Sequence, residues 1–221
     1  MYYENIYHQK LAKLMAQPNM VMIGDTFRLQ DPTPELNVIQ NPARGFDVDY
    51  AEKFFQWIIT GSKDISIMHA TGGKAKNFDI DYNGRCTAYG PRITDQLPKL
   101  LQTLSTYPES RRGTIMILGA EDQEIAIALH EGETKCEYPC TMGLNFWVDD
   151  GRLNMHTTMR SNNYVSTVCI DVYIFTRLMQ AVASWLGLFV GTYHHHVVNA
   201  HILPQDRQRA IAILEQWGNP K

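Results

Sequence analysis

A thiol beside a cation can act as a nucleophile, and one cysteine of this sequence has a suitable position. Cys140 follows Tyr138-Pro139 and precedes a run of alternating apolar and polar residues that predicts a strand. Because proline ends any preceding element, the thiol is expected at a strand edge, near the mouth of a cleft. The alternative is a buried cysteine that only fills the core.

Two arginine-containing segments have the chemistry of a phosphate site. Arg111-Arg112 follows a predicted helix, and Arg160-Ser161 ends a predicted strand. The planar guanidinium group can bind two phosphate oxygens at once. Arginines next to a turn are also common at solvated corners, so neither segment is specific by itself.

A carboxylate opens the long helix that we predict over residues 170–186. Asp171 lies in the first turn of this helix, where free backbone N–H groups and the helix dipole favour an acid. The simplest interpretation is therefore a helix cap, and the alternative is a ligand contact.

A metal site is the less favoured interpretation of the remaining cysteines and histidines. Cys136 and Cys140 are four residues apart, and three histidines occupy 194–196. Strand alternation turns His195 away from its two neighbours, and one loosely spaced cysteine pair is not a typical zinc pattern. We therefore predict no metal.

Hydrophobic periodicity predicts the elements that position these residues. Helices are expected over 5–16, 49–60, 93–106, 170–186 and 205–217, and strands over 20–29, 114–118, 141–160 and 190–202. The strand region 141–160 is a hairpin that turns at Asp149-Asp150-Gly151, while 30–48 and 62–92 are predicted to be loops. Long antiparallel strands with several helices predict a single α+β domain over residues 1–221.

Composition narrows the class of protein. The net charge of −3 gives no reason to expect a nucleic-acid partner. We expect no membrane span, because no apolar run approaches about 18 residues, and residues 1–10 lack a signal-peptide pattern. Four cysteines without a secretion signal are expected to be reduced, in the cytoplasm or in the host cytoplasm if the chain is viral.

Taken in order, these features resemble the thymidylate synthase family, within it most closely the cytidylate hydroxymethylases. The matching residues run from Trp57 to His201: Tyr89-Gly90, Pro108-Glu109-Ser110-Arg111-Arg112, Pro139-Cys140, Asn145-Phe146-Trp147-Val148, Arg160-Ser161-Asn162, Asp171 and His201. The most specific part is Pro-Cys, a hairpin, Arg-Ser, and an acid eleven residues after that arginine. The resemblance implies a large mixed or antiparallel sheet packed by helices, in a homodimer that associates through its sheets.

The resemblance also implies a role for each matching residue. Cys140 would add to C6 of a pyrimidine, and Tyr89 would belong to the hydrogen-bond network around it. His201 would lie near the sugar hydroxyl of a nucleoside monophosphate.

Two pairs of residues would then hold phosphate. Arg160 and Ser161 align with residues that bind the phosphate within one subunit. Arg111 and Arg112 align with a pair that reaches the phosphate of the other subunit, so a homodimer would share its active sites.

The residue type at position 171 would determine which base is bound. Family members that act on uracil have asparagine there, because an amide both donates and accepts and so pairs with N3–H and O4. A carboxylate accepts instead from the N4 amine of cytosine, and a proton on N3 would give it a second contact. Since a buried polar group left unpaired is costly, we expect a cytidine monophosphate, dCMP or CMP, as substrate.

The sequence departs from the family pattern in three places. The catalytic glutamate normally stands three residues before a tryptophan, but Phe54 precedes Trp57, and we assign the role to the nearest acid, Glu52. The aspartate that grips the pterin of the folate is Asn163 here. Only 20 residues follow His201, so a reduced closing segment should admit water and favour hydroxymethyl over methyl transfer.

We therefore expect a 5-hydroxymethyltransferase that takes its one-carbon unit from 5,10-methylenetetrahydrofolate. One alternative is a methylase that makes thymidylate or 5-methyl-dCMP. A second is a nucleotide-binding protein that has lost catalysis.

Overall fold

The computed structural model describes residues 3–64, 66, 87–134 and 136–218. Within these residues, five strands form one mixed sheet in the order β1-β5-β4-β3-β2. The strands are β1 (Val21–Gln30), β2 (Gly113–Met116), β3 (Thr141–Asp149), β4 (Arg152–Asn163) and β5 (Phe189–His201). Neighbouring strands are antiparallel except β4 and β5, which are parallel. The α+β class is confirmed.

The hairpin of β3 and β4 follows from its turn residues. Asp150 and Gly151 have φ values of 46° and 67°, the positive values that a tight hairpin turn requires at its two central positions. The pairing runs from the turn to Thr141 opposite Met159. Cys140 and Arg160 flank that last pair, so the register brings them to the same end of the hairpin.

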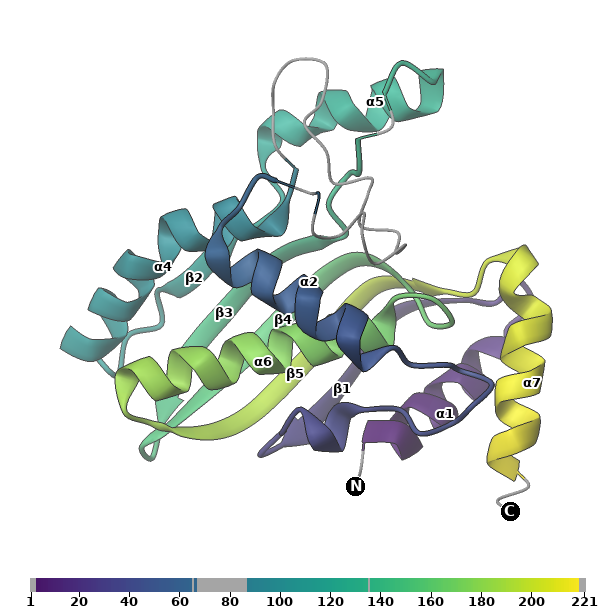
Figure 1. Cartoon of the computed structure of the whole chain (residues 1–221), viewed down its shortest axis with the longest axis horizontal. Helices are drawn as coiled ribbons and strands as arrows, with labels where there is room; N and C mark the ends of the chain where they lie inside the picture. The colour runs from purple at the N-terminus through teal and green to yellow at the C-terminus, as the bar shows by residue number, and fades with distance from the viewer. Residues whose placement is uncertain (1–2, 65, 67–86, 135, 219–221) are drawn as a thin grey trace.

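The connection from β4 to β5 determines where the chemical groups gather. α6 (Val168–Leu186) crosses the sheet between these two parallel strands and ends at Gly187, whose φ is 66° (Figure 1). The carboxyl ends of the two strands therefore meet, with Asn163 opposite His201. In open sheets with parallel strands, this edge is where ligands commonly bind.

The remaining helices pack around this frame. They are α1 (Tyr3–Met15), α2 (Val48–Thr60), α4 (Tyr89–Thr106), α5 (Gln123–Glu131) and α7 (Arg207–Gly218), with 3-10 turns at Glu35–Asn37, Ala120–Asp122 and Pro204–Asp206. α2, α4 and α6 lie over one face of the sheet (Figure 1), and Trp57, Phe146 and Phe175 are almost fully buried in the core. No helix among the described residues is both long and apolar enough to cross a membrane.

Two helices differ from the sequence prediction. α4 begins at Tyr89 rather than at residue 93, because Pro91 is tolerated in a first helical turn. α5 has only 9 residues and was not predicted. Cys86 and most of the predicted loop 62–92 lie outside the described residues.

The histidine run alternates as predicted. His195 is fully buried, whereas His194 and His196 are partly exposed on the other face of β5. Among the described residues, no group of three or more histidine, cysteine or acidic side chains is arranged to hold a metal ion.

Candidate active site

Cys140 and Arg160 are in direct contact at the end of the β3–β4 hairpin. The backbone N–H of Arg160 donates to the carbonyl of Cys140 at 2.8 Å, and Nη2 of Arg160 lies 3.6 Å from Cys140 Sγ. The thiol is partly buried rather than hidden in the core. Cys140 packs against the edge of the hydrophobic core and is partly accessible.

The guanidinium of Arg160 is held by the segment that precedes the cysteine. Nε donates to the carbonyl of Pro139 at 2.8 Å and Nη2 donates to the carbonyl of Tyr138 at 3.0 Å. The Tyr138 ring lies 4.5 Å from the guanidinium carbon, which adds a cation–π contact. These contacts fix a positive charge beside the thiol.

Burial and charge act in opposite directions on this thiol. Burial raises the pKa of Cys140 to about 11, the Arg160 guanidinium acts against that rise, and Asp171 and Glu137 add to it. The sulfur is therefore a thiol at neutral pH, and it must lose its proton before it can attack.

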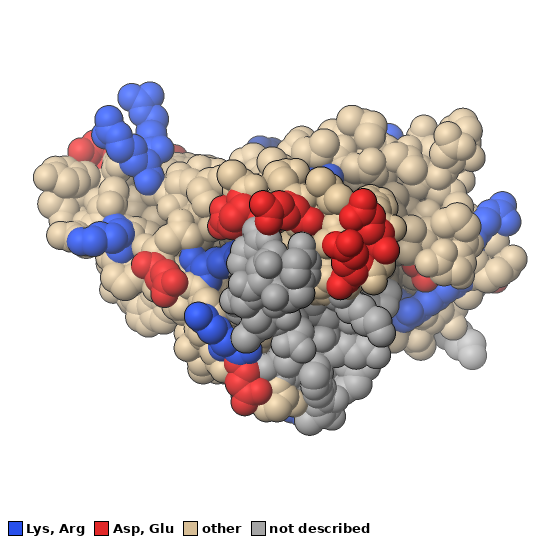
Figure 2. Space-filling view, turned by 90° about the horizontal axis from the view of Figure 1, so that it is seen from above, with Lys and Arg blue, Asp and Glu red and all other residues tan. Residues whose placement is uncertain are grey.

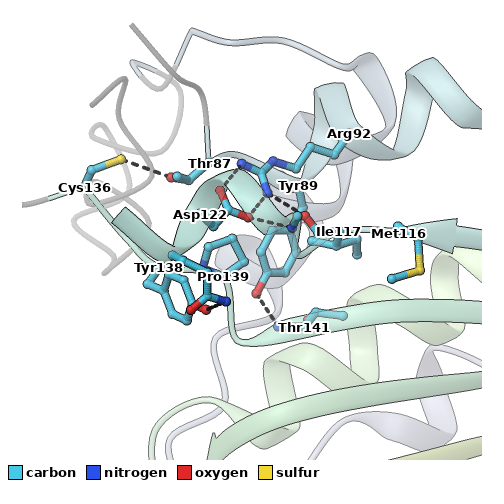
Figure 3. A network of polar contacts seen from close by, with 12 residues as sticks. Thr87, Tyr89, Arg92, Met116, Ile117, Asp122, Cys136, Tyr138, Pro139 and Thr141 are labelled. Atoms are coloured by element: carbon cyan, nitrogen blue, oxygen red, sulfur yellow. Dashed lines mark hydrogen bonds and ion pairs between the residues drawn. The ribbon is translucent and has the colours of Figure 1, made fainter. Parts of the chain in front are cut away.

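Tyr89 supports the backbone at Cys140 and Thr141. Its hydroxyl oxygen accepts from the N–H groups of Cys140 and Thr141, both at 3.2 Å. Figure 3 shows the tyrosine reaching from α4 to the start of β3. The ring is buried and stacks on Phe175 of α6, with ring centroids 6.4 Å apart. Tyr89 thus links the start of β3 to α4 and α6.

The start of α4 is itself fixed by an ion pair that the sequence patterns did not reveal. Arg92 lies one turn after Tyr89 and binds both carboxylate oxygens of Asp122, at 2.6 and 2.7 Å (Figure 3). Asp122 is fully buried and also accepts from the N–H of Gly119 at 2.8 Å. The two partners are 30 residues apart, so no local spacing could have indicated the pair.

Breaking this ion pair should be costly. Asp122→Asn leaves the largely buried Arg92 guanidinium without its counter-charge, and we expect a loss of about 3 kcal/mol in the free energy of unfolding. Asp31→Asn is the matched control, because Asp31 and Arg152 form an exposed pair worth at most about 1 kcal/mol. Urea denaturation would compare the two variants, and equal losses would contradict the assignment.

Asp171 does not cap its helix. The N-cap position of α6 is Thr167, which makes no side-chain cap bond. The backbone N–H of Asp171 donates to the carbonyl of Thr167, as in any helical turn. The carboxyl is instead buried, and burial raises its pKa to about 7, while the nearby Asn162 amide acts against that rise. A carboxyl that is not needed by the helix remains available to a ligand.

Ser161 and His201 lie side by side at the carboxyl ends of β4 and β5. Ser161 Oγ is 3.4 Å from His201 Nδ1, a contact between two residues that are 40 positions apart. The sequence-predicted residues Cys140, Tyr89, Arg160, Ser161, Asp171 and His201 therefore occupy one edge of the sheet.

Comparison with known proteins agrees with this arrangement. The family model for thymidylate synthase matches residues 51–217. The chain belongs to the thymidylate synthase family. It is 23% identical over 206 residues to the deoxyuridylate hydroxymethyltransferase of Bacillus phage SP01, covering 81% of this chain and 51% of that protein.

Two bacterial relatives carry the family name itself. The thymidylate synthase of Symbiobacterium thermophilum is 26% identical over 167 residues, which is 66% of this chain and 56% of the relative. That of Bacillus licheniformis is 27% identical over 153 residues, 68% of this chain and 51% of the relative. This member of the thymidylate synthase family thus spans little more than half the length of these relatives.

The structure does not bring Glu52 to the other candidate residues. Its carboxylate accepts from Arg177 at 3.0 and 3.2 Å and from Tyr173 at 3.1 Å. At 100° per residue, Tyr173 and Arg177 project from the side of α6 opposite to Asp171. Partial burial disfavours the charge of Glu52, but the bonds from Arg177 and its neighbours lower the pKa below the usual value. Glu52 therefore joins α2 to α6, while Phe54 is buried.

Asn163, the residue expected near the folate, is also engaged internally. Its Nδ2 donates to Asp206 at 2.7 Å, and its Oδ1 accepts from the N–H groups of Val165 and Ser166 at 2.8 and 3.2 Å. The side chain stabilises the turn between β4 and α6 and joins it to the 3-10 turn before α7.

Arg111 and Arg112 lie at the far end of α4 from Tyr89. The helix has 18 residues and is therefore about 27 Å long. Both arginines line an open hollow of about 710 Å³ together with Tyr107 and Glu109. Lys and Arg side chains project on the side of the molecule where α4 ends (Figure 2, left). The structure therefore does not bring this pair to Cys140 and Arg160.

Proposed function

We propose that this protein is a pyrimidine nucleotide 5-hydroxymethyltransferase that acts in the cytoplasm on a cytidine monophosphate, dCMP or CMP. The observation that carries the proposal is Asp171, a buried carboxyl close enough to Cys140 to raise the pKa of its thiol. By resemblance, this is where enzymes that act on uracil have an amide.

Both protonation states of Asp171 can pair with cytosine. Because burial raises the pKa of this carboxyl to about 7, a large share of it carries a proton at neutral pH. The protonated group donates to N3 and accepts from the N4 amine of cytosine, but it can also accept from N3–H and donate to O4 of uracil, so the ionised group makes the selection. The ionised group accepts from N4 and faces the O4 acceptor of uracil with a like partial charge, which disfavours uracil.

Cys140 would carry the covalent step. Its sulfur forms a bond to C6 after losing its proton, and the electron pair of the C5–C6 double bond becomes available at C5 for a bond to the one-carbon unit. Loss of the C5 proton would then break the bond between the one-carbon unit and the folate nitrogen, so that tetrahydrofolate leaves and an exocyclic methylene remains on C5. Water would add to this methylene and supply the hydroxyl, and departure of the sulfur from C6 would restore the C5–C6 double bond. The Arg160 guanidinium, 3.6 Å from the sulfur, stabilises the thiolate and would also bind the phosphate together with Ser161.

5,10-Methylenetetrahydrofolate would supply the one-carbon unit at the oxidation level of formaldehyde. The described residues do not include an evident pterin ligand, since both ends of the Asn163 amide are already bonded within the turn. We therefore assign no residue of this chain to the folate.

A homodimer would complete the phosphate site. Arg111 and Arg112 lie a helix length from Tyr89 and face outward, so a second copy is the partner whose phosphate they can reach. In Figure 1, α2, α4 and α6 cover one face of the sheet. Association of two copies through their sheets would use the opposite face.

Two alternatives have specific support. A methylase that makes thymidylate or 5-methyl-dCMP agrees with the names of the bacterial relatives. The second alternative is a nucleotide-binding protein without turnover. It agrees with the loss of the catalytic glutamate, because Phe54 stands at the expected position and the nearest acid, Glu52, is paired with Arg177.

Product mass spectrometry would separate these possibilities. The protein would be incubated with 5,10-methylenetetrahydrofolate and, separately, with CMP, dCMP and dUMP. We expect a gain of about 30 mass units on a cytidine nucleotide, while a gain of about 14 would indicate methyl transfer. Binding without any change in mass would support the nucleotide-binding alternative and contradict the proposal.

A further inference from the structure

Tyr138 contacts the guanidinium of Arg160 both through its backbone and through its ring. Its carbonyl accepts from Nη2 at 3.0 Å, and the guanidinium carbon lies over the ring, 4.5 Å from the centroid. The carbonyl of Pro139 accepts from Nε at 2.8 Å. All three contacts come from the two residues that directly precede Cys140.

The two carbonyls hold only one edge of the guanidinium. Nε–H and the neighbouring N–H of Nη2 lie on the same edge of this planar group, and both point to the backbone of residues 138 and 139. A plane held along one edge can still pivot about that edge. The ring of Tyr138 lies against one face of the plane and opposes this pivoting. The side chain of Tyr138 therefore determines where the remaining N–H groups of Arg160 point.

Those remaining N–H groups carry the chemistry of Arg160. Nη2 also lies 3.6 Å from Cys140 Sγ. Nη1 has no hydrogen-bond partner among the residues that the structure describes, so its two N–H groups can be donated to a ligand. One guanidinium can thus serve the sulfur through Nη2 and an anionic ligand through Nη1, and both contacts depend on the orientation of the plane.

The ring of Tyr138 is in turn held by α5. Nε2 of Gln123, the first residue of α5, donates to the Tyr138 hydroxyl at 3.1 Å. The preceding residue is Asp122, which binds Arg92 of α4 (Figure 3). α4 therefore supports the nucleophile in two ways: Tyr89 contacts the backbone of the cysteine, and Arg92 fixes the start of the helix that holds the Tyr138 ring.

We propose that Tyr138 is a positioning residue for Arg160, whose ring fixes the guanidinium plane so that Nη2 meets the sulfur of Cys140 and Nη1 is left for the phosphate of the nucleotide. The part that concerns phosphate rests on the proposed function. The part that concerns the sulfur does not require a nucleotide, and it can be tested on the protein alone.

Tyr138→Leu is the direct test, because it removes the ring and keeps the carbonyl. Cys140 would be alkylated at pH 8 with neutral iodoacetamide and, separately, with anionic iodoacetate, and mass spectrometry would follow the peptide that contains Cys140. Both reagents attack the same thiolate, so the ratio of their rates reports the charge beside the sulfur rather than the pKa of the thiol. We expect the ratio of iodoacetate to iodoacetamide rates to fall about fivefold, toward the ratio of Arg160→Gln.

Two matched variants separate the ring from other effects. Tyr138→Phe keeps the ring and loses only the bond from Gln123, so its ratio should stay within about twofold of the wild type. Phe189→Leu removes a ring that lies 5.9 Å from Arg152, at the other end of β4, and should leave the ratio unchanged. A folded Tyr138→Leu with the wild-type ratio would overturn the inference, and so would an Arg160→Gln that does not lower the ratio.

Calorimetry with dCMP and CMP would test the phosphate contact. Tyr138→Leu should weaken the binding of whichever nucleotide the wild type prefers by about tenfold, while Phe189→Leu should bind it as the wild type does. Unchanged affinity in Tyr138→Leu would contradict the assignment of Nη1 to phosphate. Failure of the proposed function would look different: the wild type would bind no nucleotide, while the alkylation ratio would still decide the role of Tyr138 at the sulfur.

Discussion

Cys140→Ala is expected to abolish formation of the 5-substituted nucleotide and to leave nucleotide affinity within about threefold of the wild type. The loss should be complete because the sulfur forms the bond that makes C5 reactive, and none of the described residues around Cys140 is a second thiol in contact with Arg160. Affinity should survive because Arg160 is held by the carbonyls of Tyr138 and Pro139 and not by the sulfur alone. Product formation and equilibrium binding, measured on the same preparation, would check both parts.

Cys136→Ala is the matched control for that experiment. Cys136 is four residues earlier, is buried, and has its sulfur 3.2 Å from the Thr87 hydroxyl. Its loss should affect stability rather than turnover. Continued turnover by Cys140→Ala would contradict a covalent mechanism, and an equal loss in Cys136→Ala would show that the effect is structural.

Asp171→Asn is expected to reverse the choice of base. An amide at this position pairs with N3–H and O4 of uracil, whereas its N–H would meet the N4 amine of cytosine, donor against donor. The ratio of the cytidylate and uridylate affinities should shift toward uridylate by about a hundredfold or more, since a buried site rejects a partner that leaves polar groups unpaired. Calorimetry with dCMP, dUMP, CMP and UMP would measure the shift, and an unchanged ratio would refute our account of base selection.

The same substitution should change stability in a pH-dependent way. The pKa of Asp171 is raised from 3.8 to about 7 on folding, so the folded state retains a proton that the unfolded chain releases. The contribution of Asp171 to stability is therefore greatest below about pH 4 and is lost as the pH rises to 7. At pH 8, Asp171→Asn should be more stable than the wild type by up to roughly 4 kcal/mol, and at pH 4 the difference should disappear.

Thermal unfolding at the two pH values would check this expectation. The titratable groups that face Asp171 are Cys140, Tyr89, Cys169 and Tyr193. Burial raises the pKa of each of these four groups, so they remain uncharged over this range. Equal stability of the two proteins at pH 8 would contradict a buried carboxyl with a raised pKa.

The cost of burying Asp171 also explains why it is a stronger functional candidate than Glu52. Glu52 has Arg177 as a counter-charge, and together they stabilise the packing of α2 on α6. Asp171 has no basic partner among the described residues that contribute to its pKa. A carboxyl kept without a counter-charge lowers stability, and such positions are typical of binding and catalytic sites.

Local residue patterns were enough to predict most of the helices and strands and the functional groups at their ends. The alternating residues of 141–160 and the Asp-Gly turn were sufficient to predict the β3–β4 hairpin, because strand alternation and turn geometry depend on neighbouring residues. The interval from Pro139-Cys140 to Arg160-Ser161 identified the family, which the match over residues 51–217 confirmed. The position of Asp171 in the first turn of a helix was also readable from sequence.

Whether a polar side chain is already paired inside the protein depends on tertiary packing and could not be predicted from these patterns. Asn163 and Glu52 had suitable chemistry in the sequence, but their partners Asp206 and Arg177 are 43 and 125 positions away. The ion pair of Arg92 and Asp122 and the contact between Asn162 and His195 are likewise long-range. Burial and hydrogen-bond partners depend on how segments far apart in the sequence pack together, and local sequence patterns do not predict that packing.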